Sequence, residues 1–528
     1  MRNPRFKPDP RPLLLSPNLA HSEVERLLAP YGFRNWKQAD ANLQRMAGDP
    51  RSRKRLAVVL PDLLHAVSGT ADPDEALREW ERYLDAGNAR PQVFAFLAQA
   101  PHVLQLLCVL FGNSPAMAET LVRDPMLVYW IEDEQILKSR PTPKRLQAAL
   151  HETLGLAHAY EHKLDALRRF HRREMLRIGA RDLFRVASVG ETAQSVSQLA
   201  EMVIHAAYQL VNKKLRKKYG IFCRQGPGWV TSETGFVVLG MGKLGGRELN
   251  YSSDVDLVYL HASSPKQTEV AKDQISLDVF FQLIARELTR VLSISTSEGC
   301  LFRVDLRLRP EGAVGPLAWA NREAVKYYQT RGRPWERLAL LRARPIAGQR
   351  SLGQAFLRKI RPFIVGREDR QNIIETVHEL RAQIHQKVQR KGEHERNVKL
   401  SPGGIRDVEF IVQTLQLLHA TTHPQLLESN TITSLQRLRD LDLLQAADGT
   451  FLEEAYAFLR DVEHKLQMVH ELQTHTLPAQ PAELTKCAIR MGYAEQPPSS
   501  ATTNFLTRYK SVRTRVQAIF ERLLLMRE

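Results

Sequence analysis

The sequence predicts an α+β protein that is mostly α-helical, with a small mixed sheet between an N-terminal helical region and a C-terminal helical bundle. Apolar residues recur every three or four positions through residues 20–220, which is the period of amphipathic helices. Short β-branched runs follow between residues 235 and 310 and indicate strands. Helical periodicity returns after residue 350. We therefore expect one sheet-containing core between two helical parts.

The N-terminal helices are marked by apolar stripes and by prolines. Residues 102–111 and 193–211 show helical period, and Thr192 is expected to cap the second of these helices. The first 20 residues are basic and proline-rich, and we interpret residues 1–20 as a mobile arm. Prolines divide the helical run and set helix boundaries, at positions 101, 115, 125, 141 and 143.

The elements after residue 220 alternate between strands and helices. Strands are predicted at 235–242, at 254–260 and, after a helix over 272–292, at 300–310. Further helices are predicted over 373–388 and 403–420, and a last helix follows the loop at 495–504. These changes divide the chain into the arm at 1–20, a helical region at 21–190, a mixed α/β domain at 191–350 and a helical bundle at 351–528.

Charge and cysteine usage limit the class of protein. The chain of 528 residues has a formal charge of +17, which fits a polyanionic partner, although solvated basic helix faces explain it equally well. The four cysteines show no CxxC or zinc spacing, which favours free thiols in a reducing cytoplasm. No apolar run reaches the ~20 residues that span a bilayer. We expect a cytoplasmic protein that does not bind a membrane.

Two aspartates one residue apart carry the strongest chemical signal. Asp254 and Asp256 lie in the predicted strand at 254–260, so their side chains share one face, with Cα atoms about 6.5 Å apart. Unpaired carboxylates repel one another at a buried strand end, and a divalent cation converts that cost into binding energy. The pair predicts a site for two magnesium ions.

A third carboxylate lies among arginines on the strand predicted at 300–310. Alternation puts Asp305 on the same face as Arg303, Arg307 and Arg309. A metal-binding aspartate beside guanidinium groups that clamp phosphate is what nucleotidyl transfer needs. The alternative is a surface strand with ordinary ion pairs.

A glycine-rich turn precedes the acidic pair. In "GMGKLGG" (residues 240–246), Gly242, Gly245 and Gly246 let the backbone turn closely past a ligand, and backbone N–H groups there can cradle phosphate oxygens. Lys243 would add a point charge to the same phosphates. Ser253 could donate to a phosphate oxygen or cap the turn before the strand. The turn, the acidic pair and the later third acid look like the opening of a polymerase-β-type nucleotidyltransferase fold.

Four long motifs extend this likeness. They are "GMGKLGGRELNYSSDVDLVYL" (240–260), "FRVDLRLRPEGAVGPLAW" (302–319), "YYQTRGRPWERLALLRARPIAG" (327–348) and "VKLSPGGIRDVEFIVQTLQLLHA" (398–420). In this order they resemble the glutamine synthetase adenylyltransferase/adenylyl-removing family. The resemblance covers residues 170 to 480 and makes residues 191–350 the nucleotidyltransferase catalytic domain.

The resemblance implies a reaction and a set of residue roles. Asp254, Asp256 and Asp305 would be catalytic and hold Mg²⁺, while Lys243, Arg307 and Arg309 would bind inorganic phosphate or the equivalent part of ATP. It also implies that "SPGGIRDVEF" faces the active site, where Arg406 would contact phosphate or ribose and Glu409 a metal or the base. Acidic residues in a first helical turn also suit the helix dipole, so a structural role for this motif remains open.

The resemblance also implies partners and a direction. The family's enzymes carry two such modules, which remove AMP from a tyrosine of glutamine synthetase with phosphate, giving ADP, or attach AMP from ATP. A nitrogen-signalling PII protein tunes the balance. This sequence shows one module, and it looks more like the amino-terminal, adenylyl-removing half. A fragment, one half of a split pair with a separate second module, and a stand-alone enzyme remain open.

Two other functional classes remain as alternatives. A nucleic-acid-directed nucleotidyltransferase would fit the charge, but the sequence contains no RNA-recognition motif and no basic stretch interleaved with aromatics, so nucleic acid is not the expected partner. A non-catalytic nucleotide-binding regulator would have no need for three mutually repelling carboxylates. The sequence therefore favours an enzyme.

Overall fold

The computed structural model describes residues 8–87, 89–219, 223–225, 228–230, 235–262, 275–366, 370–469, 473–494 and 499–524. The chain forms two compact units whose segments interleave along the sequence. The first unit comprises Met1–Arg140, Met175–Ser188 and His464–Arg508, and the second comprises Pro141–Glu174, Val189–Glu463 and Tyr509–Glu528. Helices α12 (Tyr160–Leu183), α22 (Ala446–Gln467) and α24 (Ala501–Leu524) contribute residues to both. The domain boundaries expected from the sequence stay predictions.

The first unit is helical in its described residues, as the apolar period predicts. Side chains of Asn35, Asp49, Asp72 and Ser114 cap α3, α4, α5 and α8 by accepting hydrogen bonds from the first turn. Pro101 and Pro115 begin α7 and α8, as predicted. The helices are α1 (Pro12–Leu15), α2 (His21–Leu28), the 3₁₀ helix η1 (Ala29–Tyr31), α3 (Trp36–Ala47), α4 (Pro50–Ser68), α5 (Pro73–Asp85), α6 (Arg90–Gln99), α7 (Pro101–Asn113), α8 (Pro115–Arg123), α9 (Leu127–Ile131), α10 (Glu134–Lys138) and α23 (Pro481–Arg490).

The predicted mobile arm is only partly within the described residues. Residues 1–7 lie outside them. Helix α1 follows, and its Leu13 and Leu14 are each 3% exposed. This part of the predicted arm therefore packs against the protein, because two adjacent leucines gain more from burial than a solvated arm would allow.

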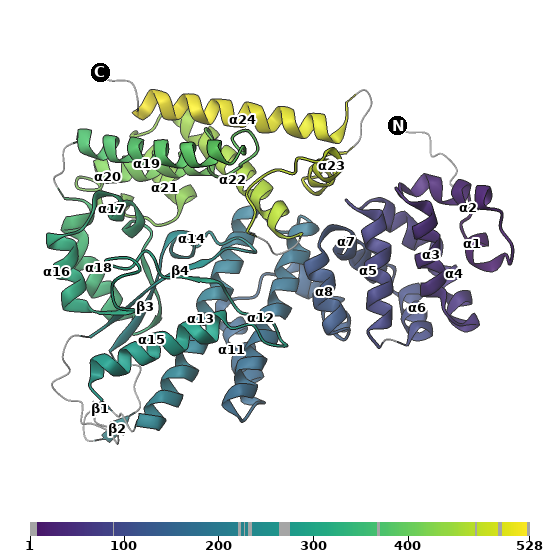
Figure 1. Cartoon of the computed structure of the whole chain (residues 1–528), viewed down its shortest axis with the longest axis horizontal. Helices are drawn as coiled ribbons and strands as arrows, with labels where there is room; N and C mark the ends of the chain where they lie inside the picture. The colour runs from purple at the N-terminus through teal and green to yellow at the C-terminus, as the bar shows by residue number, and fades with distance from the viewer. Residues whose placement is uncertain are drawn as a thin grey trace. The chain divides into compact units, whose positions relative to one another are not determined.

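The second unit holds the sheet and its covering helices (Figure 1). Pro143 begins α11, again as predicted. Helix α13 begins at Val189, so the prediction that Thr192 caps it is wrong: Thr192 is buried inside the first turn. The helices are α11 (Pro143–Gly155), α13 (Val189–Tyr219), α14 (Gly242–Gly245), α15 (Leu277–Ser293), α16 (Asn321–Thr330), α17 (Pro334–Leu340), α18 (Arg350–Ile364), α19 (Arg370–Arg390), α20 (Ile405–His419), the 3₁₀ helix η2 (Pro424–Leu426) and α21 (Thr431–Asp440).

A five-stranded mixed sheet forms the core of the second unit. Strand β3 (Phe236–Gly240) pairs antiparallel with β4 (Val255–His261) on one side and with β7 (Arg344–Gly348) on the other. Two short strands share the outer edge of β4 and run parallel to it: β5 (Val304–Asp305) and β6 (Ala318–Ala320). Strands β1 (Cys223–Gln225) and β2 (Gly228–Val230) form a separate antiparallel pair. The predicted α+β class, mostly helical with a small mixed sheet, is confirmed.

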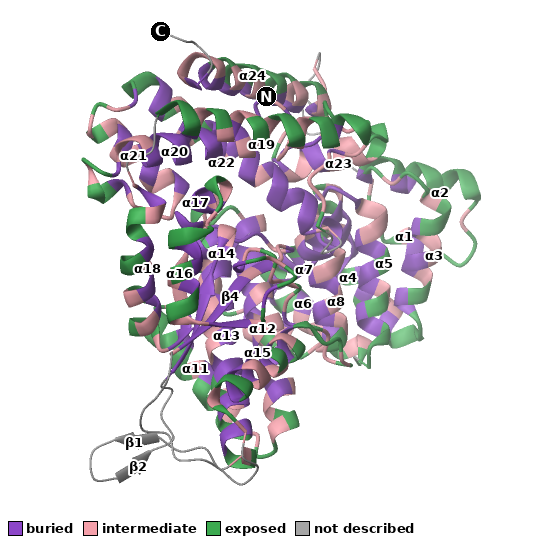
Figure 2. Ribbon diagram, turned by 60° about the vertical axis from the view of Figure 1, so that its left-hand side comes forward, coloured by how far each residue is buried: buried purple, intermediate pink, exposed green. Residues whose placement is uncertain are grey.

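The sheet is buried between helices. Every residue of β3 and most of β4 are buried, as Figure 2 shows for β4. Helices α13 and α18 contact β7, while α15 contacts β5 and β6. Aromatic rings join these layers, since Phe236 of β3 stacks on Tyr208 of α13 with ring centroids 5.6 Å apart. The sheet is thus packed against α13, α15 and α18.

The strand predicted at 300–310 is much shorter than expected. Only Val304 and Asp305 are in strand conformation, and the chain then turns. Arg309 causes the turn, because its buried guanidinium donates hydrogen bonds to the carbonyls of Leu306, Ala313, Gly315 and Pro316. The alternating pattern of residues 303–309 therefore belongs to a braced loop.

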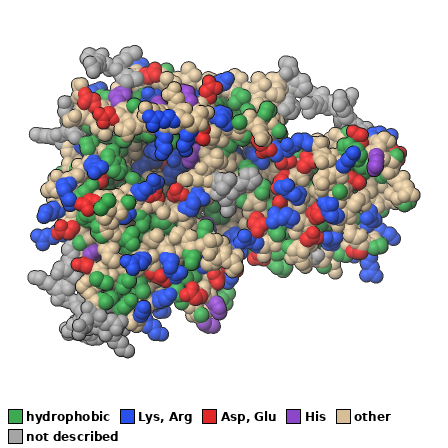
Figure 3. Space-filling view, in the orientation of Figure 1, with side chains coloured by type: hydrophobic (Ala, Val, Ile, Leu, Met, Phe, Trp, Pro, Cys, Tyr) green, Lys and Arg blue, Asp and Glu red, His purple; other side chains and the backbone are tan. Residues whose placement is uncertain are grey.

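No single helix of the described chain is long and apolar enough to cross a membrane, although the bent pair α6 and α7 meets that criterion jointly, with 114° between them. Cys108 and Cys300 are free thiols. Lys and Arg side chains lie among acidic ones over the face in Figure 3.

Candidate active site

The parallel pairing of β4 with β5 brings the predicted acidic residues to one end of the sheet. Asp256 lies directly opposite Asp305 in the register, and Val255 opposite Val304. Asp254 immediately precedes β4, where the amide of Val255 donates to the carbonyl of Arg303 at 2.9 Å. Two segments 50 residues apart in sequence thus present three aspartates at one sheet end.

Arginines occupy two of these three carboxylates. Asp254 accepts a hydrogen bond from Nε of Arg303 at 2.8 Å. Asp305 accepts from the backbone amide of Arg307 at 2.8 Å and from its guanidinium at 2.5 to 3.0 Å. Within the described ranges, no group of three or more Asp, Glu, His or Cys side chains is gathered closely enough to hold a metal ion. The backbone collects the acids, but two of the side chains are turned towards arginines.

Asp256 differs from its neighbours because its charge has no direct partner. None of the described residues forms an ion pair with its carboxylate. Burial, followed by the negative charge of Asp305, raises the pKa of Asp256 to about 6, although Lys399 opposes the shift. In contrast, the hydrogen bonds from Arg307 lower the pKa of Asp305. Asp256 is therefore the carboxylate that gains most from a bound cation.

Gly242 is required by contact with this carboxylate. Its φ is +51°, in the left-handed region, and a Cβ atom there would lie 2.6 Å from Oδ2 of Asp256. The amide of the preceding Met241 donates to the carbonyl of Asp256 at 2.9 Å. The turn after β3 is thus fitted to Asp256, which explains the glycine in physical terms.

Gly245 and Gly246 pack against protein backbone. A Cβ at Gly245 would lie 1.6 Å from the carbonyl oxygen of Arg342, and one at Gly246 would lie 2.9 Å from that of Ser429. Their amides donate to the carbonyls of Met241 and Gly242 at 3.0 Å. These two amides are used inside the turn, so their predicted role in cradling phosphate has no direct support from the geometry.

Lys243 points away from the acids and into a buried ion pair. Its Nζ atom lies 2.8 Å from both carboxylate oxygens of Glu463 on α22. Burial lowers the pKa of Lys243 to about 7, against the raising effect of Glu463. The ammonium group predicted to bind phosphate is therefore held by a carboxylate of the chain itself.

Four further predicted residues also have partners within the protein. Oγ of Ser253 accepts from the amide of Asn250 at 3.2 Å, which is the turn-capping alternative. Arg309 braces the loop that follows β5, as described above. Arg406 and Glu409, on the first turns of α20, form an ion pair of 2.9 Å with each other. Predicted phosphate contacts from these residues stay predictions.

Glu409 belongs to a buried network. It also pairs with Arg342 at 3.1 Å, and its side chain is 2% exposed. Burial works to raise the pKa of Glu409, but Arg342, Arg406 and two lysines outweigh it and lower the pKa to about 2. Glu409 therefore stays ionised and fixes Arg342 in place.

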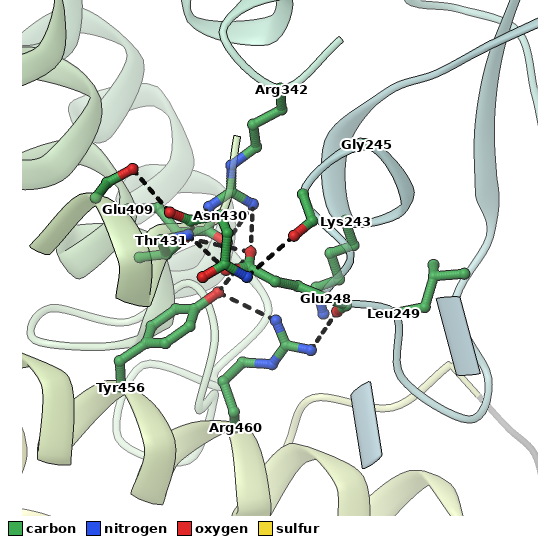
Figure 4. Close-up of polar contacts among 12 residues, drawn as sticks. Lys243, Gly245, Glu248, Leu249, Arg342, Glu409, Asn430, Thr431, Tyr456 and Arg460 are labelled. Atoms are coloured by element: carbon green, nitrogen blue, oxygen red, sulfur yellow. Dashed lines mark hydrogen bonds and ion pairs between the residues drawn. The ribbon is translucent and has the colours of Figure 1, made fainter. Parts of the chain in front are cut away.

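Glu248 is the centre of this network (Figure 4). Its carboxylate accepts from the amide of Thr431 at 2.7 Å and from the hydroxyl of Tyr456 at 3.0 Å, and it pairs with Arg342 at 3.2 Å. Arg460 donates to the Glu248 carbonyl and to the Asn250 side chain. The segment between β3 and β4 is thus held by helices α21 and α22 and by Arg342, which Glu409 of α20 pairs with in turn.

Lys399 is a residue that the sequence did not single out. It lies in the loop before α20, and its charge acts on Asp256, Glu409 and Glu463. It is part of the motif "VKLSPGGIRDVEF", but its spacing from the acids gives no sign of proximity. Tertiary folding alone brings it to the site.

A glycine turn, an acidic residue on the next strand and another acid on the parallel neighbour, in a small mixed sheet, define an α+β fold of the nucleotidyltransferase type. Residues 104–359 match the family model described as "Glutamate-ammonia ligase adenylyltransferase". Residues 378–524 match a second family model, described as "GlnD PII-uridylyltransferase". The chain carries a domain of the glutamate–ammonia ligase adenylyltransferase family, and the resemblance drawn from its motifs is confirmed.

Curated relatives agree with this assignment. A protein of Nitrosococcus oceani is 36% identical over 424 residues, which cover 80% of this chain and 42% of the relative. A protein of Streptomyces avermitilis is 32% identical over 514 residues, covering 97% of this chain and 48% of the relative. Both are named bifunctional glutamine synthetase adenylyltransferase/adenylyl-removing enzyme. The chain spans about half the length of the curated relatives it matches.

Proposed function

We propose that the protein is a nucleotidyltransferase that acts on glutamine synthetase. It removes AMP from an adenylylated tyrosine by phosphorolysis, or attaches AMP to that tyrosine from ATP. The family match and the names of the relatives support the substrate. The observation that carries the proposal is the register that sets Asp256 opposite Asp305 beside the glycine turn.

Magnesium is part of this proposal. The donor set fits a divalent cation, because carboxylate oxygens are its preferred ligands and Asp256 is an unpaired carboxylate whose ionisation is costly without one. Arg303 and Arg307 can turn away, since their side chains are 48% and 80% exposed. Asp254, Asp256 and Asp305 would hold the ion. Bound there, it would stabilise negative charge on the attacking and departing oxygens.

The reaction exchanges one phosphorus–oxygen bond for another. In removal, an oxygen of inorganic phosphate forms a bond to the α-phosphorus of the tyrosyl ester, and the bond from that phosphorus to the tyrosine oxygen breaks. The tyrosine oxygen ends protonated with the proton that hydrogen phosphate loses, and the other product is ADP. In transfer, the tyrosine oxygen attacks the α-phosphorus of ATP, and pyrophosphate leaves.

The chain's own residues would orient these groups. In the transfer direction Asp305 would accept the tyrosine proton, because release of Arg307 removes the hydrogen bonds that lower its pKa and makes it a stronger base. Arg307, released from Asp305, would face the phosphate groups with a side chain that is largely exposed. The glycine turn fixes Asp256, and the network around Glu248 fixes the turn.

One assay of two reactions tests the function. The protein is incubated with AMP-modified glutamine synthetase, phosphate and Mg²⁺ and ADP release is measured, and in parallel with unmodified enzyme and labelled ATP. ADP release supports removal, and labelled protein supports transfer. An Asp256→Asn variant is the matched control and is expected to be inactive in both. If the wild-type protein catalysed neither reaction, the proposal would be refuted.

Regulation by a PII protein is a further part of the proposal. Its support is the match of residues 378–524 to the PII-uridylyltransferase model, together with the contacts that tie this region to the glycine turn.

A separate second adenylyltransferase module is a further partner that we propose, because the relatives are twice as long as the aligned segment.

A further inference from the structure

The cations around the acidic residues are nearly all paired within the chain. Arg303 binds Asp254, Arg307 binds Asp305, and Lys243 binds Glu463. Arg309 donates to backbone carbonyls of its own loop. Lys399 is different: no residue in the described ranges forms an ion pair or hydrogen bond with its ammonium group. An unpaired, largely enclosed cation is costly unless a ligand pairs with it.

The backbone that carries Lys399 is fixed. The side chain of Asn397 accepts the amides of Lys399 and Leu400 at 3.2 and 2.8 Å. The carbonyl of Lys399 accepts the amide of Arg406 at 2.9 Å, which joins the loop to the start of α20. A Cβ at Gly404 would lie 3.0 Å from that carbonyl oxygen. Lys399 is therefore presented from a rigid support.

The positive charge of Lys399 lowers the pKa of the unpaired Asp256 carboxyl, against the effect of burial. Each charge acts on the other, yet the two groups are too far apart for an ion pair. Arg406 flanks the same space: its side chain is one-third exposed, and its Nε atom is buried without a hydrogen-bond partner in the described chain. Lys399 and Nε of Arg406 thus both lack a hydrogen-bond partner among the described residues, and their backbones are joined by the bond from the Arg406 amide to the Lys399 carbonyl.

We propose that Lys399, assisted by Arg406, binds a phosphate oxyanion of the reaction in place of Lys243. This inference rests on the proposed function. The oxyanion belongs either to inorganic phosphate, in the removal direction, or to the β- and γ-phosphates of ATP, in the transfer direction. The Lys399 ammonium contributes charge-assisted hydrogen bonds and a fixed position for the oxyanion relative to Asp256.

The test compares Lys399→Gln with Lys391→Gln, whose exposed lysine lies eight residues earlier in the same region. Lys399→Gln is expected to raise the KM for inorganic phosphate or for ATP about 10-fold or more, since hydrogen bonds to charged groups contribute about 1.5–3 kcal/mol. A rise for phosphate alone assigns the site to the co-substrate of removal, and a rise for ATP alone assigns it to the nucleotide. Lys399→Arg is expected to restore part of the affinity, and Lys391→Gln to match the wild type.

Two further measurements on Lys399→Gln separate an effect on folding from an effect on ligand binding. Removing Lys399 leaves no orphaned partner and removes the cost of an unpaired, enclosed cation, so Lys399→Gln is expected to unfold at or above the wild-type temperature. Calorimetric binding of ADP gives a readout without turnover, and the Lys399→Gln variant is expected to bind it at least several-fold more weakly. Unchanged KM values for phosphate and ATP in an active Lys399→Gln protein would overturn the inference. If the wild type were inactive, the proposed function would fail, and the ADP titration alone would decide about Lys399.

Discussion

At the scale of single residues, the site combines a carboxylate that resists ionisation with neighbours that are already paired. Asp256 is enclosed and faces Asp305 across the strand pair, while Asp254 and Asp305 each hold an arginine. Because Asp256 is enclosed beside another carboxylate, its ionised form destabilises the folded protein but favours the binding of a cation. Stability and activity therefore respond in opposite directions when this residue is changed.

We expect Asp256→Asn to lower turnover by at least about 100-fold while raising stability at alkaline pH. The pKa of Asp256 is about 6 in the folded protein, against an ordinary value of 3.8 for an aspartate in the unfolded chain. The native state thus binds more protons between these values, so its stability falls as pH rises through this window. Asparagine removes that penalty, a gain of up to about 3 kcal/mol above pH ~6 and none below pH ~4. Urea unfolding of the wild type and the variant at pH 4 and pH 8 measures the change in the free energy of unfolding at each pH. An equal change at the two pH values would contradict the raised pKa of Asp256.

Alternation along a strand predicts that Asp254 and Asp256 share a face, but it does not predict that Asp305 joins them, which the likeness to a nucleotidyltransferase fold implied. In the structure Asp256 lies opposite Asp305 in the register, and Asp254 immediately precedes β4. The phosphate-binding roles expected for Lys243 and Arg309 depended on where each side chain points. Lys243 instead binds Glu463 of α22, and Arg309 binds carbonyls of its own loop, which local sequence does not reveal. Lys399 reaches the site from a loop more than 90 residues beyond β5, which no spacing rule foretells.

At the scale of elements, the glycine turn is a packing device between a strand and the helices behind it. Gly245 touches the backbone of Arg342, and Lys243 reaches α22. The turn therefore has two kinds of support: close backbone contact and a buried ion pair. Each can be broken separately.

Gly245→Ala is expected to lower the free energy of unfolding by about 3 kcal/mol or more, because its Cβ would lie 1.6 Å from the Arg342 carbonyl oxygen, a backbone atom with no rotamer to change. Gly155→Ala on α11 is the control: no atom lies within 4 Å of the added carbon, and alanine favours the helix by up to about 1 kcal/mol. Chemical denaturation compares the two variants. A mild effect at Gly245 would show that the turn can shift freely.

The Lys243–Glu463 pair is expected to couple α14 to α22 energetically. Either Lys243→Met or Glu463→Gln leaves a buried polar or charged group without its partner, whereas the double variant removes both. We therefore expect the double variant to cost about 1–3 kcal/mol less than the sum of the single variants. The exposed pair Lys138–Glu134 is the control and is expected to couple by less than about 0.5 kcal/mol. Additive effects at Lys243 and Glu463 would argue against the coupling.

Elements with strong local signals were predicted well, and those shaped by long-range contacts were not. β3, β4 and helices α13, α19 and α20 follow their apolar periods. β5 is shorter than its alternation suggests because Arg309 draws the following residues into a loop. Strands β6 and β7 are short and depend on β4 and β3 for their hydrogen bonds, so the sequence alone gave little sign of them.

At the scale of the whole molecule, the compact units do not follow chain order. The second unit takes residues from three separate stretches, and the segment that follows the glycine turn is held by α21 and α22. The segment that matches the adenylyltransferase model ends at residue 359, before these helices begin. The segment that matches the adenylyltransferase model thus covers less of the chain than the site requires, and the helices that complete the site lie in the segment that matches the second model.

A chain shortened after Gly366 is therefore expected to lose cooperative unfolding, although it retains the whole segment that matches the family model. It lacks Thr431 and Tyr456, which donate hydrogen bonds to Glu248, and it lacks Glu463, the partner of the buried Lys243 ammonium. Thermal unfolding followed by circular dichroism, with the full chain as reference, checks this. A sharp transition in the shortened chain would show that residues 104–359 fold by themselves.

The order of helices and sheet along the chain was predictable, because composition and periodicity change where the architecture changes. The interleaving of the two units was not, because it depends on α12, α22 and α24 each having residues in both. The buried network had no sequence signature either, since Glu248 meets Thr431 and Tyr456 from about 180 and 210 positions away. Contacts of that range are settled only by the completed fold.

The register of β4 with β5 makes this site sensitive to the number of residues that lead into β5 as well as to their identity. Adding or deleting one residue between Phe302 and Val304 would leave every acid in the sequence but rotate Asp305 to the opposite side of its strand. An insertion in a distant surface loop can be absorbed locally, whereas the odd or even number of residues leading into Asp305 matters to the site as much as the aspartate itself.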